Sequence, residues 1–154
     1  MSRPNRGHEF LSDAEFRAWH GALQFTTEAV RALDEALDDA HDISITEFDV
    51  LITLFNAPGE RLRMTELAER VTLTPSGLTH LVTRLERKGF VTRVIDPDDR
   101  RSYFAELTAP GDRKLRDSRV THNDVVRERL TRRLTDEQLA TLGDLWQTIE
   151  SEPA

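Results

Sequence analysis

The spacing of apolar residues along the chain changes abruptly at Gly89 and changes back after Thr108. Before Gly89 they recur every three or four positions, as on one face of a helix. Residues 90–95 have a period of two and are rich in β-branched types, and residues 102–107 can form a returning strand. Asp, Pro and Arg fill positions 96–101 between them, as in a turn. The chain is therefore predicted to be mainly α-helical with one small β-hairpin.

Three capping boxes mark predicted helix starts, because each places a hydroxyl residue three positions before Glu or Gln. They are Ser12 with Glu15, Ser44 with Glu47, and Thr135 with Gln138. Together with the apolar stripes they predict six helices: 12–40, one from Ser44 to Ala57, a short one begun by Thr65, one from Thr74 to Gly89, 109–133, and one from Thr135 onward.

Length and composition narrow the possible functions. The 154 residues include no cysteine, which excludes disulfides and thiolate chemistry within this chain. Neither a membrane-spanning apolar run nor a secretory signal is recognisable, so we expect a cytoplasmic protein. No Gly-x-Ser-x-Gly, phosphate-cradling glycine loop or His-Glu-x-x-His motif is present, so we expect no enzyme and no cofactor.

The charge of the chain is unevenly distributed. The net charge is −7, yet residues 61–116 contain 12 Lys and Arg against 8 Asp and Glu, a balance of +4. A locally basic segment is the electrostatic signature of phosphate binding, even inside an acidic protein. The basic segment coincides with the helix pair and hairpin over residues 62–108, which has the layout of a winged helix-turn-helix.

The second helix of that pair supplies the candidate DNA contacts, because its N-terminal residues would face base edges in the major groove. Its outward positions include hydroxyl, imidazole and guanidinium groups that hydrogen-bond bases or phosphates; a merely solvated charged face is the alternative. Arg100 and Arg101 at the hairpin tip would enter the adjacent minor groove. An Asp99–Arg101 pair would orient that arginine. The candidate DNA contacts are Thr74, Ser76, Thr79, His80, Arg84, Arg100 and Arg101, with Asp99 as support.

These motifs resemble the MarR (multiple-antibiotic-resistance regulator) family. The family's wing signature, Asp-x-Arg, five residues, then Leu-Thr, matches residues 99–108, and Pro110-Gly111 follows as usual. Residues 62–68 and 76–89 match its helix pair. The resemblance implies that Ser76, Thr79, His80 and Arg84 face the major groove and that Arg100 and Arg101 belong to the wing. Relatives often carry arginine in place of His80, and a neutral histidine lacks the bidentate fork of arginine.

The terminal helices have apolar stripes broader than a small central domain can cover, and packing within one subunit is the alternative to a shared interface. The resemblance favours a homodimer, which would read a pseudo-palindromic operator in double-stranded DNA. We therefore expect a flexible N-terminus over 1–11, a helical dimerisation region over 12–43 and 109–150, and a DNA-binding domain over 44–108. The candidate interface residues are Phe16, Trp19, Leu23, Leu130, Leu139, Leu142, Leu145, Trp146 and Ile149.

The resemblance also implies a repressor relieved by a small effector, often aromatic or anionic, bound between the dimer interface and the DNA-binding lobe. Arg17, Trp19, His20 and Asp49 could line such a crevice. Trp19 is more readily explained as a core or interface aromatic, and Asp49 equally well as a solvated or ion-paired residue.

Two further alternatives concern metal binding and the role of the winged domain. Asp38, His41 and Asp42 have helical spacing suited to a metal, although solvated acids at a helix end explain them better, so no metal is predicted. The alternative to a DNA-binding regulator is a helical dimer whose degenerate winged domain binds proteins. Of these two functions, only DNA binding should weaken steeply as the salt concentration rises.

Overall fold

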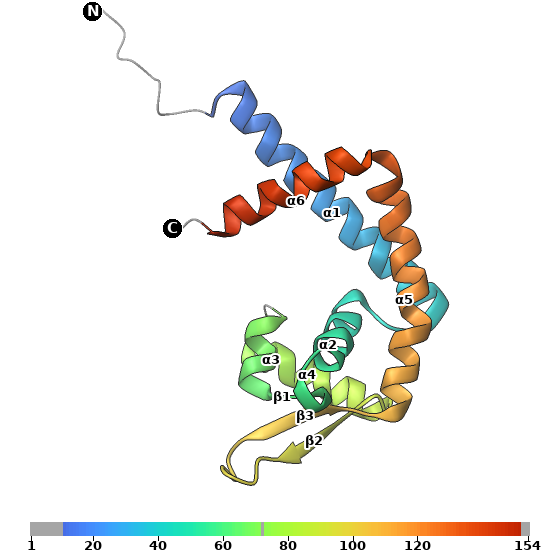
Figure 1. Cartoon of the computed structure of the whole chain (residues 1–154). Helices are drawn as coiled ribbons and strands as arrows, with labels where there is room; N and C mark the ends of the chain where they lie inside the picture. Colours follow the sequence, from blue (N-terminus) through green and yellow to red (C-terminus); the bar gives the residue numbers. More distant parts are fainter. Residues whose placement is uncertain (1–10, 72, 152–154) are drawn as a thin grey trace, which may run out of the picture.

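The computed structural model describes residues 11–71 and 73–151, so the predicted flexible N-terminus lies almost entirely outside the described residues. The chain forms a winged lobe joined by a long helix to two arm-like terminal helices (Figure 1). The elements are α1 (Asp13–His41), α2 (Ile45–Phe55), the 3-10 turn η1 (Pro58–Glu60), β1 (Arg61–Arg63), α3 (Met64–Arg70), α4 (Pro75–Arg87), β2 (Val91–Ile95), β3 (Tyr103–Leu107), α5 (Ala109–Arg129), the 3-10 turn η2 (Thr131–Arg133) and α6 (Asp136–Ser151).

All three predicted capping boxes are confirmed. The Ser12 amide donates to Glu15 at 2.7 Å, and the Ser44 amide donates to Glu47 at 2.9 Å. The third box uses Gln138, whose Oε1 accepts from the Thr135 amide at 2.9 Å. Each bond joins residues only three positions apart, which is why the sequence pattern could locate these helix starts.

The structure adds one strand to the predicted elements and moves the end of one helix. The hairpin is part of a three-stranded antiparallel sheet, in which the short strand β1 pairs with β3 and gives the order β1-β3-β2. Three residues are too few for a recognisable period, which is why β1 was missed. The helix predicted to reach Arg133 ends at Arg129, and Arg133 folds back so that its Nε donates to the Glu128 carbonyl at 3.0 Å.

The hydrophobic core lies within the winged lobe and at its junction with α1 and α5. Leu37 of α1 and Leu115 of α5 are buried in one cluster with residues of α2, α3, α4 and the sheet. These two buried side chains attach α1 and α5 to the winged lobe, and α5 runs from the sheet up to the arms (Figure 1). The core is made of Leu37, Ile43, Phe48, Val50, Leu51, Leu54, Ala57, Leu62, Leu67, Ala68, Leu78, Leu81, Val82, Leu85, Val91, Ala105 and Leu115.

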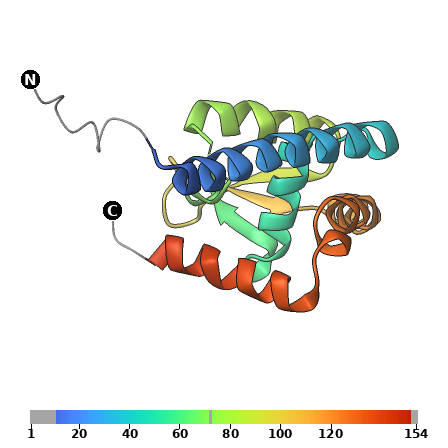
Figure 2. The same cartoon turned by 90° about the horizontal axis from the view of Figure 1, so that it is seen from above.

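The arms, by contrast, leave large apolar side chains uncovered. Seen from above, α6 lies at one edge of the molecule and apart from α1 (Figure 2), and no residue of α6 is buried. Trp19 is 65% exposed, Trp146 46% and Ile149 65%. These side chains line an open apolar groove of about 910 Å³, formed by Leu11, Glu15, Ala18, Trp19, Gly21, Ala22, Phe25, Leu130, Leu142, Leu145, Trp146 and Ile149.

Among the described residues, no helix is both long enough and apolar enough to cross a membrane.

Candidate nucleic-acid interface

Helix α4 has one buried and one exposed face, as its sequence predicts. Leu78, Leu81, Val82 and Leu85 are buried in the core. The helix begins at Pro75, which has no amide hydrogen to satisfy, after the N-cap Thr74, whose hydroxyl accepts from the Gly77 amide at 3.2 Å. The face turned to solvent consists of Ser76, Thr79, His80, Arg84 and Arg87.

Hydrogen bonds within α4 determine what its hydroxyl groups offer to a ligand. Thr79 Oγ1 donates to the Pro75 carbonyl at 2.9 Å, and Thr83 Oγ1 donates to the Thr79 carbonyl at 2.8 Å. The exposed Thr79 can therefore offer a ligand its methyl group and its oxygen lone pairs, while its hydroxyl hydrogen is engaged. Such a surface suits thymine methyl groups and amino donors of bases in the major groove.

The wing tip is organised by Asp99. Its Oδ1 accepts from the Arg101 amide at 3.0 Å, and its Oδ2 accepts from Ser102 Oγ at 2.8 Å. The backbone hydrogen bond from Arg101, and next the Ser102 hydroxyl, lower the pKa of the Asp99 carboxyl. The expected Asp99–Arg101 pairing therefore needs correction: Asp99 holds the backbone of Arg101 and not its guanidinium, because a tight turn places the amide within reach.

We expect Asp99→Ala to weaken operator binding several-fold, because the turn that presents Arg101 loses both of its side-chain acceptors. A lowered carboxyl pKa means that this support is present above the ordinary Asp pKa and is lost as pH falls through the folded-state value. Fluorescence polarisation at neutral pH measures the effect. Asp98→Ala is the matched control, since it removes the same charge next to the DNA and should leave affinity unchanged or slightly higher. Equal affinities of the two variants would contradict this role for Asp99.

A second acidic residue, Asp96, anchors the base of the wing. Its side chain is 1% exposed, and its Oδ2 lies 2.7 Å from Nη2 of Arg63 in an ion pair. Its Oδ1 accepts from the Asp98 amide at 2.9 Å. This ion pair joins the end of β2 to strand β1, and the charge of Asp96 is therefore balanced by Arg63 within the winged lobe. Sequence reasoning missed this contact because Arg63 belongs to the strand that it did not predict.

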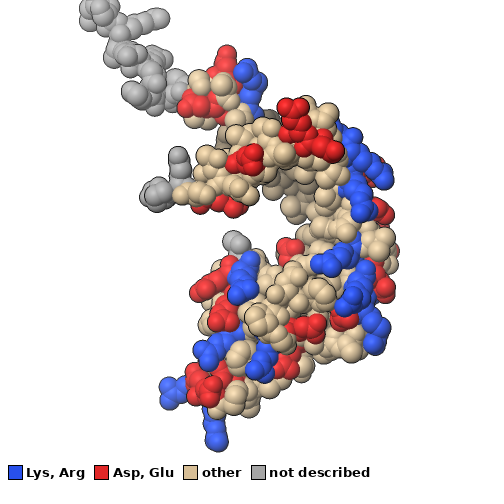
Figure 3. Space-filling view, viewed as in Figure 1, with Lys and Arg blue, Asp and Glu red and all other residues tan. Residues whose placement is uncertain are grey.

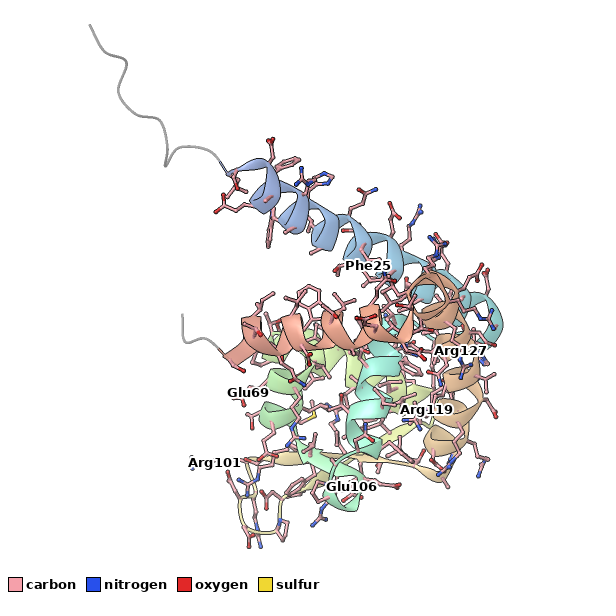
Figure 4. All side chains as sticks on the ribbon, turned by 45° about the horizontal axis from the view of Figure 1, so that its top comes forward. Phe25, Glu69, Arg101, Glu106, Arg119 and Arg127 are labelled. Carbon is pink, nitrogen blue, oxygen red and sulfur yellow. The ribbon has the colours of Figure 1, made fainter. Side chains whose placement is uncertain are left out.

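The wing, the start of α3 and α4 line a cleft of about 330 Å³, to which α4 contributes Thr79 and the wing contributes Arg101. Arg63 and Arg93 also line it, and Arg93 is paired with Glu86 at 2.7 Å. Within the described residues, no ion pair holds the guanidinium of Arg100 or Arg101. Figure 4 shows Arg101 at the free end of the wing, and Figure 3 shows basic side chains at this end of the lobe and along α5.

Arg84 lies on another side of α4, next to helix α2. Its Nε is 3.1 Å from Oε1 of Glu47, which is buried, while 55% of the Arg84 side chain stays exposed. The sequence predicted Glu47 only as a capping residue of α2. A capping pattern carries no information about Arg84, which is 37 positions later in the chain.

The structure does not gather the four predicted effector residues into one site. Arg17, Trp19 and His20 lie in the first turns of α1, which project away from the winged lobe (Figure 1), and Trp19 lines the apolar groove. The His20 ring stacks on Phe16 with centroids 5.3 Å apart. Asp49 lies on α2, where desolvation raises the pKa of its carboxyl and the nearby charge of His122 on α5 opposes that shift.

His41 and Asp42, two of the three residues considered for a metal site with Asp38, have other partners. His41 Nε2 lies 2.8 Å from the Thr121 hydroxyl of α5, and Asp42 is the left-handed C-cap of α1, with φ 54°. Among the residues that the structure describes, no group of three His, Cys, Asp or Glu side chains is arranged to hold a metal ion.

These observations define a class of protein. A solvent-exposed polar helix face next to an arginine-tipped wing, on a helix-turn-helix built from α3 and α4, is the architecture of a winged helix-turn-helix DNA-binding protein.

Comparison with known proteins identifies the family. The MarR family model matches residues 43–103. The chain is similar to Sco3205, a MarR family transcriptional regulator from Streptomyces coelicolor in complex with DNA: 35% identity, a TM-score of 0.86, and coverage of 94% of this chain and 92% of that one. The chain therefore belongs to the MarR family, a family of transcriptional regulators and not of enzymes.

Two further relatives agree with this assignment. A mutant MarR from E. coli complexed with operator DNA is 26% identical, with a TM-score of 0.76 and coverage of 90% of this chain and 99% of that one. The HTH-type transcriptional repressor YetL from Bacillus subtilis (strain 168) is 34% identical over 110 residues, 70% of this chain. The matched region spans 66% of YetL and 47% of the uncharacterised regulator YkoM from the same strain.

Proposed function

We propose that this protein is a cytoplasmic, homodimeric repressor that binds a pseudo-palindromic operator in double-stranded DNA and releases it when a small molecule binds. The observation that carries the proposal is the cleft that Thr79 of α4 and Arg101 of the wing both line. One element can occupy the major groove while the other reaches the neighbouring minor groove. The complexes of Sco3205 and E. coli MarR with DNA support the same use of this fold.

The apolar groove of the arms supports the homodimer. An exposed apolar surface of this extent on a regulator needs a partner, and a second copy offers an identical surface. A twofold axis through the arms would set two α4 helices on one face of the DNA. Half-sites about 10 base pairs apart are the expected spacing.

A crevice between α1 and the start of α2 supports the response to an effector. It has a volume of about 620 Å³, and Arg84 of α4 forms part of its wall. Arg31 of α1 is also in the wall, whereas Asp34 is engaged by the Ile45 amide at 2.8 Å. Four hydroxyl residues and two apolar residues complete the lining: Thr26, Thr27, Ser44, Thr46, Val30 and Ile45. Two guanidinium groups and several hydroxyls suit a small anionic compound, and a ligand there would touch both the arm and α4.

We expect Arg101→Ala to weaken operator binding and to flatten its salt dependence. Each lost phosphate contact should lower the slope of log affinity against log salt by about 0.9, so a dimer should lose about 2. The measurement is fluorescence polarisation across a salt series, with labelled DNA from upstream of the protein's own gene and scrambled DNA for comparison. Arg127→Ala is the matched control, since Arg127 lies on α5 far from Arg101 (Figure 4).

The outcomes separate the two candidate functions. Tight, sequence-selective and salt-sensitive binding supports the repressor. Equal slopes for Arg101→Ala and Arg127→Ala would remove Arg101 from the interface. Absence of DNA binding even at low salt, both to this DNA and in an unbiased selection of sites, would contradict the proposal and favour a protein-binding winged domain.

A further inference from the structure

Glu47 is a buried carboxylate that joins two helices of the winged lobe. Its side chain is 2% exposed, although it lies in the first turn of α2. Oε2 accepts from the Ser44 amide at 2.9 Å and from Lys88 Nζ at 3.2 Å, and Oε1 accepts from Arg84 Nε at 3.1 Å. Buried carboxylates are stable only when paired and hydrogen-bonded, and here both oxygens are used.

Arg84 lies in the last turn of α4 and Lys88 is its C-cap, so Glu47 holds the end of this helix against α2. Lys88 also donates to the Asp42 carbonyl at the end of α1. Among the residues that the structure describes, Arg84 is held through Nε alone, so no hydrogen bond or ion pair there uses the donors of its two terminal nitrogens. With 55% of the side chain exposed, the guanidinium is anchored at its base and open at its tip. An arginine held in this way is already ordered for bidentate contact with an anion.

The position of Arg84 on α4 indicates which part of DNA it meets. It is the tenth residue of the helix, whereas base edges are read by the N-terminal turns. Arg84 also lies about 140° around the helix axis from Thr79, at 100° per residue. It shares a hollow of about 220 Å³ with His80 and with Thr46 of α2, on a different side of α4 from the wing cleft. A guanidinium at the flank of a helix that occupies the major groove faces the DNA backbone.

We propose that Glu47 is a positioning residue for operator recognition: it orders Arg84 so that its terminal guanidinium nitrogens contact a backbone phosphate. The inference rests on the proposed function, because it requires α4 to occupy a major groove. It adds a buried residue that touches no DNA and acts through Arg84.

The substitution Glu47→Gln separates this role from a simple charge effect, because the two explanations predict changes in DNA affinity of opposite sign. Removing a negative charge near DNA should leave binding unchanged or strengthen it. A glutamine, however, has one acceptor oxygen where the carboxylate has two. If that oxygen caps α2, as Gln138 does for α6, the amide NH₂ faces the Nε–H of Arg84 and the anchor is lost.

We expect Glu47→Gln to weaken operator binding roughly tenfold, because each of two protomers must then order a long side chain on binding. Fluorescence polarisation measures the affinity, at a temperature where thermal melting shows every variant to be folded. Glu35→Gln is the matched control: it removes the same charge from an exposed α1 residue, whose ion pair with Arg31 measures 4.0 Å. Equal affinities for the two variants, or tighter binding by Glu47→Gln, would overturn the proposal.

A double-mutant cycle with Arg84→Met tests whether Glu47 acts through Arg84. Arg84→Met should lower the salt slope of the dimer by about 2, as expected for two lost phosphate contacts. On that background, Glu47→Gln should have almost no further effect on affinity. A full tenfold loss in the double variant would show that Glu47 supports binding by another route, and relaxed selectivity at one base pair without a change in slope would show base reading.

A readout without DNA keeps this inference distinct from the proposed function. In nitrogen-15 spectra the Nε–H of Arg84 should be shifted and slow to exchange in the wild type and in Glu35→Gln, and fast in Glu47→Gln. If this pattern holds but the wild type binds no DNA, the proposed function and the phosphate contact of Arg84 are both contradicted. The hydrogen bond between Glu47 and Arg84 would still be confirmed. If the wild type binds its operator but Glu47→Gln binds equally well, only the positioning role fails.

Discussion

Replacing Leu142 and Trp146 together with aspartate is expected to convert the protein to a monomer and abolish high-affinity operator binding. Both side chains line the apolar groove between the arms, and Trp146 is 46% exposed in the single chain. A partner that covers this groove would bury two unpaired carboxylates per protomer, which costs several kcal/mol for each charge. A monomer would retain one reading helix, and losing the second should lower affinity by about 10²–10⁴.

Light scattering and analytical ultracentrifugation at micromolar concentration measure the assembly, and fluorescence polarisation measures the binding. Ala140→Asp with Gln147→Asp is the matched control, since both residues are exposed on α6 and neither lines the groove. The control should remain dimeric and bind DNA. A stable dimer of the Leu142 and Trp146 variant would place the interface elsewhere on the molecule.

Replacing Gly111 with alanine is expected to destabilise the winged lobe by about 3 kcal/mol through overpacking of backbone. A Cβ at this position would lie 2.0 Å from the carbonyl oxygen of Phe90 and 3.0 Å from Leu107 Cδ1. The first neighbour is backbone, so no side-chain rotation relieves the clash. The same Phe90 carbonyl accepts from the Thr108 amide at 3.1 Å. This hydrogen bond joins the start of α5 to the segment between α4 and β2. The substitution therefore separates the lobe from the helix that supports it.

Urea unfolding followed by circular dichroism tests this prediction. Gly143→Ala is the matched control, because a Cβ there meets nothing within 4 Å. In a helix interior, that change should stabilise the protein by about 0.5–1 kcal/mol. A midpoint for Gly111→Ala equal to that of the wild type would show that α5 can shift without cost.

Several parts of the site were predictable because their causes lie close together in the sequence. The Thr74 cap, the buried stripe of Leu78, Leu81, Val82 and Leu85, and the exposed hydroxyls between them follow from helical spacing alone. The polar turn before Ser102 predicted the wing. The detailed function of its acids was not predictable, because Asp99 bonds to the Arg101 backbone and Asp96 to an arginine 33 positions earlier.

The sequence by itself determined where the helices begin, which of their faces are apolar, and that a basic winged segment lies within an acidic chain. These properties depend on neighbours within one or two turns, where capping hydrogen bonds and helical periodicity act. Only the tertiary structure decided that β1 completes the sheet, that Glu47 holds Arg84, and that the arms leave an open apolar groove. Each of these depends on residues far apart in the chain, and the sequence pattern contains no information about which distant charges and surfaces the fold brings together.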